Sequence, residues 1–243
     1  MIISHKYKYV FVELPRTGST AISAELIQNY AGEPILEKHS RYKTFLRTAT
    51  AEEKTYKVVS GIRNPLDDAV SRLEKYRRRT ERIRQTNWFA KKRCEFIEKT
   101  DGDYSKYLRR YYRLPYDNWS NSEHRKFDLV IRFEDIQGGL AKFAEMIGTE
   151  LVRELPVKNK TKGKKPFESY YPPSLVPHAV WVFGPYMRDW GYEFPESWDA
   201  GEIPRSSQLL YSAMSGPRGL YWSHVRHPNA QLDVLLNRVF AVR

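Results

Sequence analysis

The sequence has little cysteine, no long apolar run and fewer acidic than basic residues. Its single cysteine, Cys94, cannot form an intramolecular disulfide, and no Cys/His cluster has the spacing of metal ligands. No stretch reaches the roughly 18 to 20 continuous apolar residues that span a bilayer, and the start of the chain lacks a signal-peptide core. These absences predict a soluble, cytoplasmic protein that has neither a membrane span nor a bound metal.

What the chain does have is positive charge and enough apolar residues for a core. Lys and Arg total 41 against 29 Asp and Glu, which gives a formal net charge of +12 over 243 residues. A field of that sign attracts anions, but charge alone does not choose among a nucleic acid, a phosphorylated nucleotide, an acidic glycan and a membrane surface. The apolar content of 41% favours one main domain. We expect this domain over 1–200 and an extension over 201–243.

Three segments rich in β-branched and aromatic residues are each followed by a helical pattern. The strand-like segments are 7–14, 56–62 and 127–133. The second is followed by the strongest helix start, because Pro65 suits the first helical position and two acidic residues come after it. After the third, we expect Glu134 and Asp135 to orient the backbone and cap the next helix. Strands that alternate with helices predict an α/β fold whose central sheet is mainly parallel and flanked by helices.

The rest of the chain contains a long basic and aromatic stretch. Residues 76–116 predict a largely helical insertion that covers the carboxyl end of the sheet, and 177–190 predict a late helix that ends at Gly191. The charge run from Arg77 to Arg93 is consistent either with a solvated helical face or with a surface that meets an acidic acceptor.

The loop Pro15-Arg16-Thr17-Gly18-Ser19-Thr20 lies between the first predicted strand and its helix. Backbone N–H groups at such a junction can surround a phosphate, although the same residues could form only a turn. Gly18 allows close backbone approach, Ser19 and Thr20 supply hydroxyl donors, and Arg16 supplies a planar positive group. The loop does not match the Walker pattern, which disfavours an ordinary ATPase.

This loop resembles the Pro-Lys-x-Gly-x-Thr type loop of the sulfotransferases that use 3′-phosphoadenosine 5′-phosphosulfate (PAPS), and it is closer to the glycan and bacterial type than to cytosolic phenol-type members. Arg63 and Ser71 are similar to the family's pair that holds the 3′-phosphate. Lys162, Gly163 and Lys164 resemble the late Lys/Gly segment that closes on the nucleotide. The resemblance covers roughly residues 7–195.

The resemblance implies a P-loop NTPase-like three-layer fold. It also implies transfer of a sulfuryl group from PAPS to a hydroxyl or amine of a carbohydrate or small-molecule acceptor, an anionic glycan or a small alcohol among them, with 3′,5′-adenosine diphosphate as the product. Two residues depart from the family pattern. Arg16 replaces the commoner Lys and would act by charge and hydrogen bonding, not as an acid. Ala21 replaces the aromatic residue that stacks on adenine in cytosolic members.

A base must also take the proton of the acceptor, and His39 is our candidate. It lies in a short strand-like segment, 35–40, and the pair Lys38–His39 resembles a segment of glycan-type sulfotransferases. Glu37 and Lys38 are secondary candidates.

Two other functions stay open at this point. A P-loop small-molecule kinase shares the strand, loop and helix but would need a Lys before the Ser/Thr of the loop and a partner for Mg²⁺. A non-catalytic nucleic-acid-binding module would use the positive charge and the aromatic residues, and predicts salt-sensitive binding to RNA or DNA.

Overall fold

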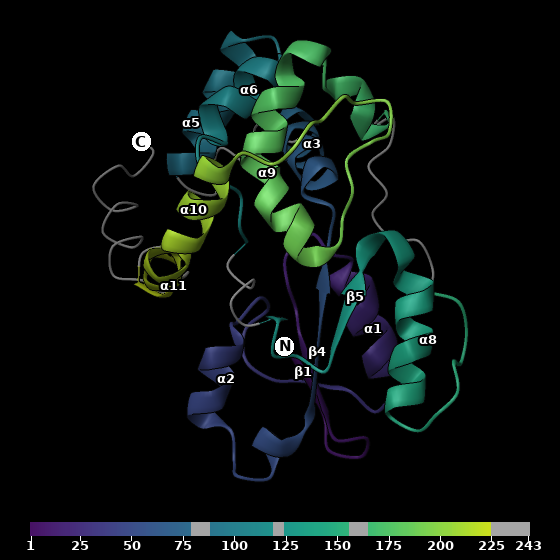
Figure 1. Cartoon of the computed structure of the whole chain (residues 1–243). Helices are drawn as coiled ribbons and strands as arrows, with labels where there is room; N and C mark the ends of the chain where they lie inside the picture. Colours follow the sequence, from purple (N-terminus) through teal and green to yellow (C-terminus); the bar gives the residue numbers. More distant parts are fainter. Residues whose placement is uncertain (79–87, 119–123, 156–164, 225–243) are drawn as a thin grey trace. The chain divides into compact units, whose positions relative to one another are not determined.

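A computed structural model of the chain describes residues 1–78, 88–118, 124–155 and 165–224 (Figure 1). These residues form two compact units. The first unit is Met1–Asn64 with Ser120–Lys160, and the second is Pro65–Trp119 with Thr161–Arg243. The domain over 1–200 and the extension over 201–243 stay predictions. Within the described residues, no helix combines the length and the apolar character that crossing a bilayer requires.

The first unit is built on a five-stranded mixed sheet with the order β3-β1-β2-β4-β5. Its strands are β1 Ile2–Ser4, β2 Tyr9–Val12, β3 Glu33–Pro34, β4 Lys57–Ile62 and β5 Leu129–Arg132. Strands β2, β4 and β5 are parallel, with Val10 opposite Val58 and Gly61 opposite Ile131. Strand β1 pairs antiparallel with β2 and β3. The α/β class is therefore confirmed, and the parallel part of the sheet is its β2-β4-β5 portion.

Helices cover both faces of this sheet because side chains alternate along each strand. The helices of the first unit are α1 Ser19–Asn29, α2 Tyr42–Thr48 and α8 Ile136–Met146, with 3₁₀ turns η1 Glu53–Thr55 and η2 Phe133–Asp135. Tyr9, Phe11 and Val59 share one cluster with residues of α1 and α8. Val10 and Val58 instead cluster with Phe45 of α2. Figure 1 shows α1 beside α8, with α2 apart from them.

Aromatic packing ties the ends of the first unit together. The Phe143 ring meets Tyr9 edge-on, with ring centroids 5.0 Å apart, and Tyr30 at 5.6 Å. The Tyr9 hydroxyl donates to the Tyr30 carbonyl oxygen at 3.0 Å, and the Tyr30 hydroxyl accepts from the backbone of Val152 at 3.1 Å. Phe143 thus holds β2, the end of α1 and the segment after α8 against one another.

The second unit is helical. Its elements are α3 Pro65–Arg78, α5 Trp88–Lys99, α6 Tyr104–Tyr111, η3 Phe167–Tyr170, η4 Pro173–Leu175, α9 Val176–Trp190, α10 Arg205–Ala213 and α11 Ser215–His224. Its core cluster joins residues of α3, α5, α6 and α9. Two sequence predictions are confirmed here: α3 begins at Pro65, and α9 ends at Gly191, whose φ of 62° is left-handed. The described part of 76–116 contains α5 and α6.

Replacing Phe143 by Ala should destabilise the chain by about 3 to 5 kcal/mol, because the ring is 1% exposed and its loss leaves a cavity between two tyrosines. Urea denaturation followed by circular dichroism measures the change. Phe89→Ala is the matched control, since that ring is 37% exposed and should cost about 1 kcal/mol or less. Equal losses for the two variants would show that the Phe143 cluster does not hold the unit together.

Candidate functional site

Three segments meet where the parallel strands of the first unit end. They are the loop that runs from Glu13 to Gly18 after β2, the pair Arg63–Asn64 after β4, and η2 after β5. The carboxyl ends of parallel strands share one edge of a sheet, and ligands of open α/β sheets bind outside that edge. The contacts among these segments define the candidate site.

The loop is packed tightly against its neighbours on both sides. Thr17 is 2% exposed, and its hydroxyl donates to the Leu14 carbonyl oxygen at 2.9 Å. A β carbon at Gly61 would lie 2.9 Å from Thr17 Oγ1, so β4 must carry glycine there. Gly18 has φ +75°, and a β carbon on it would lie 2.6 Å from Ile136 Cδ1. The loop is therefore held between β4 and the start of α8.

Helix α1 begins directly at the end of this loop. The Gly18 carbonyl oxygen accepts from Ala21 at 2.9 Å and from Ile22 at 3.1 Å, which starts the helical ladder at Ser19. The first N–H groups of a helix have no partner within it, and the helix dipole makes that end positive. The described first turn of α1 contains no acidic residue. Ser19 is buried, whereas Thr20 is exposed and accepts from Lys38 Nζ at 2.8 Å.

Two arginines add charge to the loop. Arg16 has φ +72°, a left-handed conformation that costs a residue with a β carbon about 1 to 2 kcal/mol. Arg63 Nη1 donates to the Arg16 carbonyl oxygen at 3.1 Å, and Arg63 Cζ lies 4.1 Å from the ring centroid of Phe133. The guanidinium group of Arg63 is thus positioned by the loop on one side and by an aromatic face on the other, as a planar cation with five N–H donors can be.

Glu134 and Asp135 serve the backbone, as the sequence predicts. Glu134 Oε1 accepts from the backbone N–H of Asn64 at 2.8 Å, which joins the ends of β4 and β5. Asp135 Oδ1 accepts from Gly138 at 3.0 Å and caps α8. Both carboxylates hold the segments around the loop in place.

His39 lies beside the loop, but in a turn. The strand-like segment predicted over 35–40 is wrong, because Leu36 and His39 have φ of 56° and 67° and no extended backbone has these values. The turn places His39 Nδ1 at 2.8 Å from the Glu13 carbonyl oxygen. Only a protonated Nδ1 can donate to a carbonyl, so in the neutral ring Nε2 holds the lone pair.

The surroundings of His39 favour its neutral form. Partial burial of the ring lowers the pKa of His39 below its ordinary value, and the hydrogen bond to Glu13 offsets only part of this effect. Burial alone would raise the pKa of the Glu13 carboxyl, but hydrogen bonds from the Met1 amino group at 2.6 Å and the Ser23 hydroxyl at 2.8 Å lower it. Glu13 is therefore a charged anchor at the end of β2, and its carbonyl orients His39.

The structure does not place the other predicted site residues relative to the loop. Ser71 is buried on α3 in the second unit. Lys162, Gly163 and Lys164 lie outside the described residues. Within the part that the structure describes, no three His, Cys, Asp or Glu side chains are grouped to hold a metal.

Sequence reasoning missed two residues that shape the site. Gly61 receives Thr17, and Phe133 lies against Arg63. A glycine inside a predicted strand is a signal of close approach by another segment, so Gly61 could have been found. Nothing local marks Phe133 as the partner of an arginine 70 residues earlier.

Replacing Gly61 by Ala should displace Thr17 and cost about 1 to 3 kcal/mol, because the added methyl group overlaps the Thr17 side chain. Thermal denaturation measures the loss. In the control Gly216→Ala, the new methyl group would meet no described atom within 4 Å, and α11 should gain up to about 1 kcal/mol. A Gly61→Ala chain as stable as the control would contradict the close packing.

No family model, curated protein or solved structure matches the chain. A function therefore has to be argued from the loop between β2 and α1, from the side chains around it and from the physical chemistry of their contacts.

Proposed function

We propose that the chain is a PAPS-dependent sulfotransferase with a P-loop NTPase-like core. It would transfer a sulfuryl group to a hydroxyl or amine of a carbohydrate or small-molecule acceptor. One contact carries the proposal: Arg63 Nη1 donates to the Arg16 carbonyl oxygen at 3.1 Å. This contact links the loop after β2 to the arginine after β4. The loop and the arginine are two parts of the sequence that resemble the donor site of the family.

The charges around the loop fit a donor that is a polyanion. Arg16 belongs to the loop, Lys38 Nζ donates to Thr20 Oγ1, and Arg63 donates to the loop backbone. These three cations accompany the positive end of α1, and such an arrangement favours phosphate and sulfate groups. In the proposed complex the loop residues Pro15–Thr20 hold the 5′-phosphosulfate end of PAPS.

The opposite end of the donor carries the 3′-phosphate. Arg63 and Ser71 would hold this phosphate, with Lys162, Gly163 and Lys164 closing over the nucleotide. Arg63 can serve both the loop and a phosphate, because one guanidinium group has five N–H donors. Ala21 directly follows the loop, so no aromatic side chain stands at that position to stack on adenine. In the proposed complex, other residues hold the adenine ring.

The proposed chemistry needs one proton acceptor and several fixed positive charges. When bound, PAPS supplies the sulfuryl group and leaves as 3′,5′-adenosine diphosphate. His39 Nε2 accepts the proton of the acceptor hydroxyl while the acceptor oxygen bonds to sulfur and the bond from sulfur to the bridging oxygen breaks. Arg16 and Lys38 stabilise the negative charge that develops on that bridging oxygen. Arg16 keeps its proton throughout.

Donor binding is tested by calorimetric titration with 3′,5′-adenosine diphosphate, 5′-ADP and ATP with Mg²⁺. We expect the 3′-phosphorylated nucleotide to bind most tightly, and Arg63→Ala to weaken it by about tenfold or more, because a charge-assisted hydrogen bond to phosphate is lost. Arg47→Ala, an exposed arginine of α2, is the matched control and should bind normally. A preference for ATP with Mg²⁺, or salt-sensitive binding of RNA without nucleotide preference, would contradict the proposal.

Turnover tests His39. With labelled PAPS and a panel of glycans and small alcohols, His39→Ala should lose about 10²- to 10⁴-fold in kcat while it keeps nucleotide affinity. His5→Ala is the control, since this histidine contacts Tyr56 instead of the loop. The active form of His39 is neutral, so the rate of the unchanged chain should rise with pH, and the midpoint of this rise should lie below the ordinary histidine pKa, because the pKa of His39 is lowered. Unchanged turnover in His39→Ala would remove it from the mechanism.

A further inference from the structure

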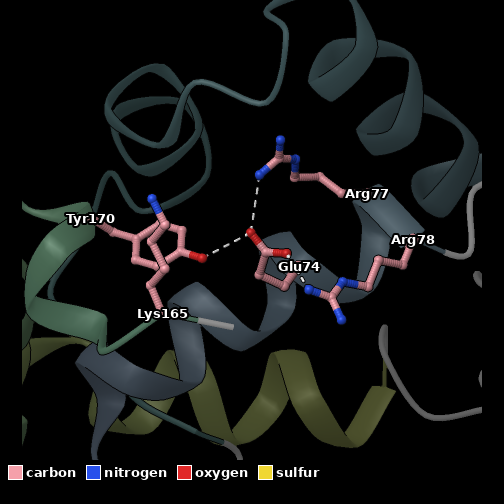
Figure 2. Close-up of a pocket in the computed structure, with 5 residues that line it drawn as sticks. All are labelled: Glu74, Arg77, Arg78, Lys165 and Tyr170. Atoms are coloured by element: carbon pink, nitrogen blue, oxygen red, sulfur yellow. Dashed lines mark hydrogen bonds and ion pairs between the residues drawn. The ribbon is translucent and has the colours of Figure 1, made fainter. Parts of the chain in front are cut away.

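The second unit contains a cavity that the proposed donor site does not use. Its volume is about 530 Å³, within the range of ligand-binding pockets. Its lining consists of Glu74, Arg77, Arg78, Lys165 and Tyr170 (Figure 2). The first three come from α3, Tyr170 ends η3, and Lys165 precedes η3 in the chain.

A buried carboxylate arranges the two arginines of this cavity. The Glu74 side chain is 6% exposed. Its Oε1 accepts from Arg77 Nη1 at 3.1 Å and from the Tyr170 hydroxyl at 3.1 Å, and its Oε2 accepts from Arg78 Nη2 at 3.3 Å. Figure 2 shows these bonds converging on Glu74. Because the arginines follow Glu74 by three and four residues on one helix, a single carboxylate can hold both.

The backbone after α5 fixes Arg77 from a second side. Gly102 has φ +67°, and a β carbon there would lie 2.6 Å from Arg77 Nε and 3.1 Å from its Cζ. The Gly102 N–H donates to the Ile97 carbonyl oxygen at 2.8 Å, which anchors this turn to α5. Arg77 is therefore held by a turn as well as by Glu74, and less side-chain entropy remains to be lost when it binds a ligand.

The lining is cationic where it meets solvent. Three of its five residues are basic and one is acidic. The side chains of Arg77 and Arg78 keep 46% and 37% of their surface exposed, and Lys165 is exposed, whereas the carboxylate of Glu74 is buried. Two guanidinium groups and an ammonium group held around one cavity match the oxygens of a sulfate or carboxylate.

We propose that this cavity binds the sulfate or carboxylate group of an acidic saccharide in preference to a neutral one. The choice of a saccharide rests on the proposed function, whereas the choice of an oxyanion rests on the lining of the cavity. The same lining would also attract the 3′-phosphate of the donor, which is the competing source of an oxyanion, and the test separates the two.

The test compares ligands that differ in one group. Inorganic sulfate, methyl β-glucuronide, methyl β-glucoside and 3′,5′-adenosine diphosphate are titrated into the full chain at fixed ionic strength. We expect sulfate and the glucuronide to bind and the glucoside, which carries CH₂OH in place of the carboxylate, to bind at least about threefold more weakly. Arg77→Gln, Arg78→Gln and Lys165→Gln should each weaken the glucuronide by about threefold to tenfold. Affinity for the nucleotide should not change.

Lys106→Gln is the matched control, because it removes one exposed positive charge from α6 outside the cavity. Lys165→Gln leaves the hydrogen bonds of Glu74 to Arg77, Arg78 and Tyr170 in place. Its effect therefore tests the cavity even if the arginine variants fail to fold. Equal binding of glucuronide and glucoside, or equal effects of Lys165→Gln and Lys106→Gln, would overturn the proposal. Loss of nucleotide affinity with unchanged glucuronide binding would overturn it too and assign the cavity to the donor.

The two proposals can fail separately. If the nucleotide does not bind the unchanged chain while the cavity variants still weaken the glucuronide, the cavity is upheld as an oxyanion site and the donor assignment fails. If the nucleotide binds through Arg63 and the cavity variants change nothing, the donor assignment holds and the saccharide inference fails.

Discussion

The close contact between Thr17 and Gly61 is the constraint on which the first unit depends. A loop that crosses the carboxyl end of a strand can approach it only where the strand carries no side chain, and β4 provides that place one residue before its end. With Thr17 seated there, Gly18 fits against Ile136, α1 starts at Ser19, and the Arg16 carbonyl oxygen comes within reach of Arg63. The geometry of the candidate site thus follows from one missing β carbon.

The sequence predicts well those features that short-range chemistry decides. Pro65 begins α3 because its fixed φ suits a first helical turn, and Gly191 ends α9 because it accepts a left-handed backbone. The buried strands β2, β4 and β5 are visible as β-branched and aromatic runs. Strand β1 has only three residues and offers no alternation to detect.

The parts that escaped prediction depend on contacts between distant residues. Ile35 and Leu36 are apolar and favour a strand, but the chain turns at Leu36 so that His39 can contact a carbonyl oxygen 26 residues earlier. The run of basic residues that begins at the end of α3 is consistent with a solvated face or with a surface that meets an acidic acceptor. The sequence does not show that its first two arginines line a cavity beside the buried Glu74. The loop after β2, the arginine after β4 and the histidine could each be named from the sequence. The contacts that join them could not.

The left-handed backbone of Arg16 has a consequence for how the loop responds to ligands. The hydrogen bond from Arg63 to the Arg16 carbonyl oxygen is one of the contacts around this strained backbone. A ligand that engages the other N–H donors of Arg63 would act on this backbone through the same side chain. Residues 16 and 63 are therefore linked through one hydrogen bond, and the effects of changing Arg16 and Arg63 together should not be additive.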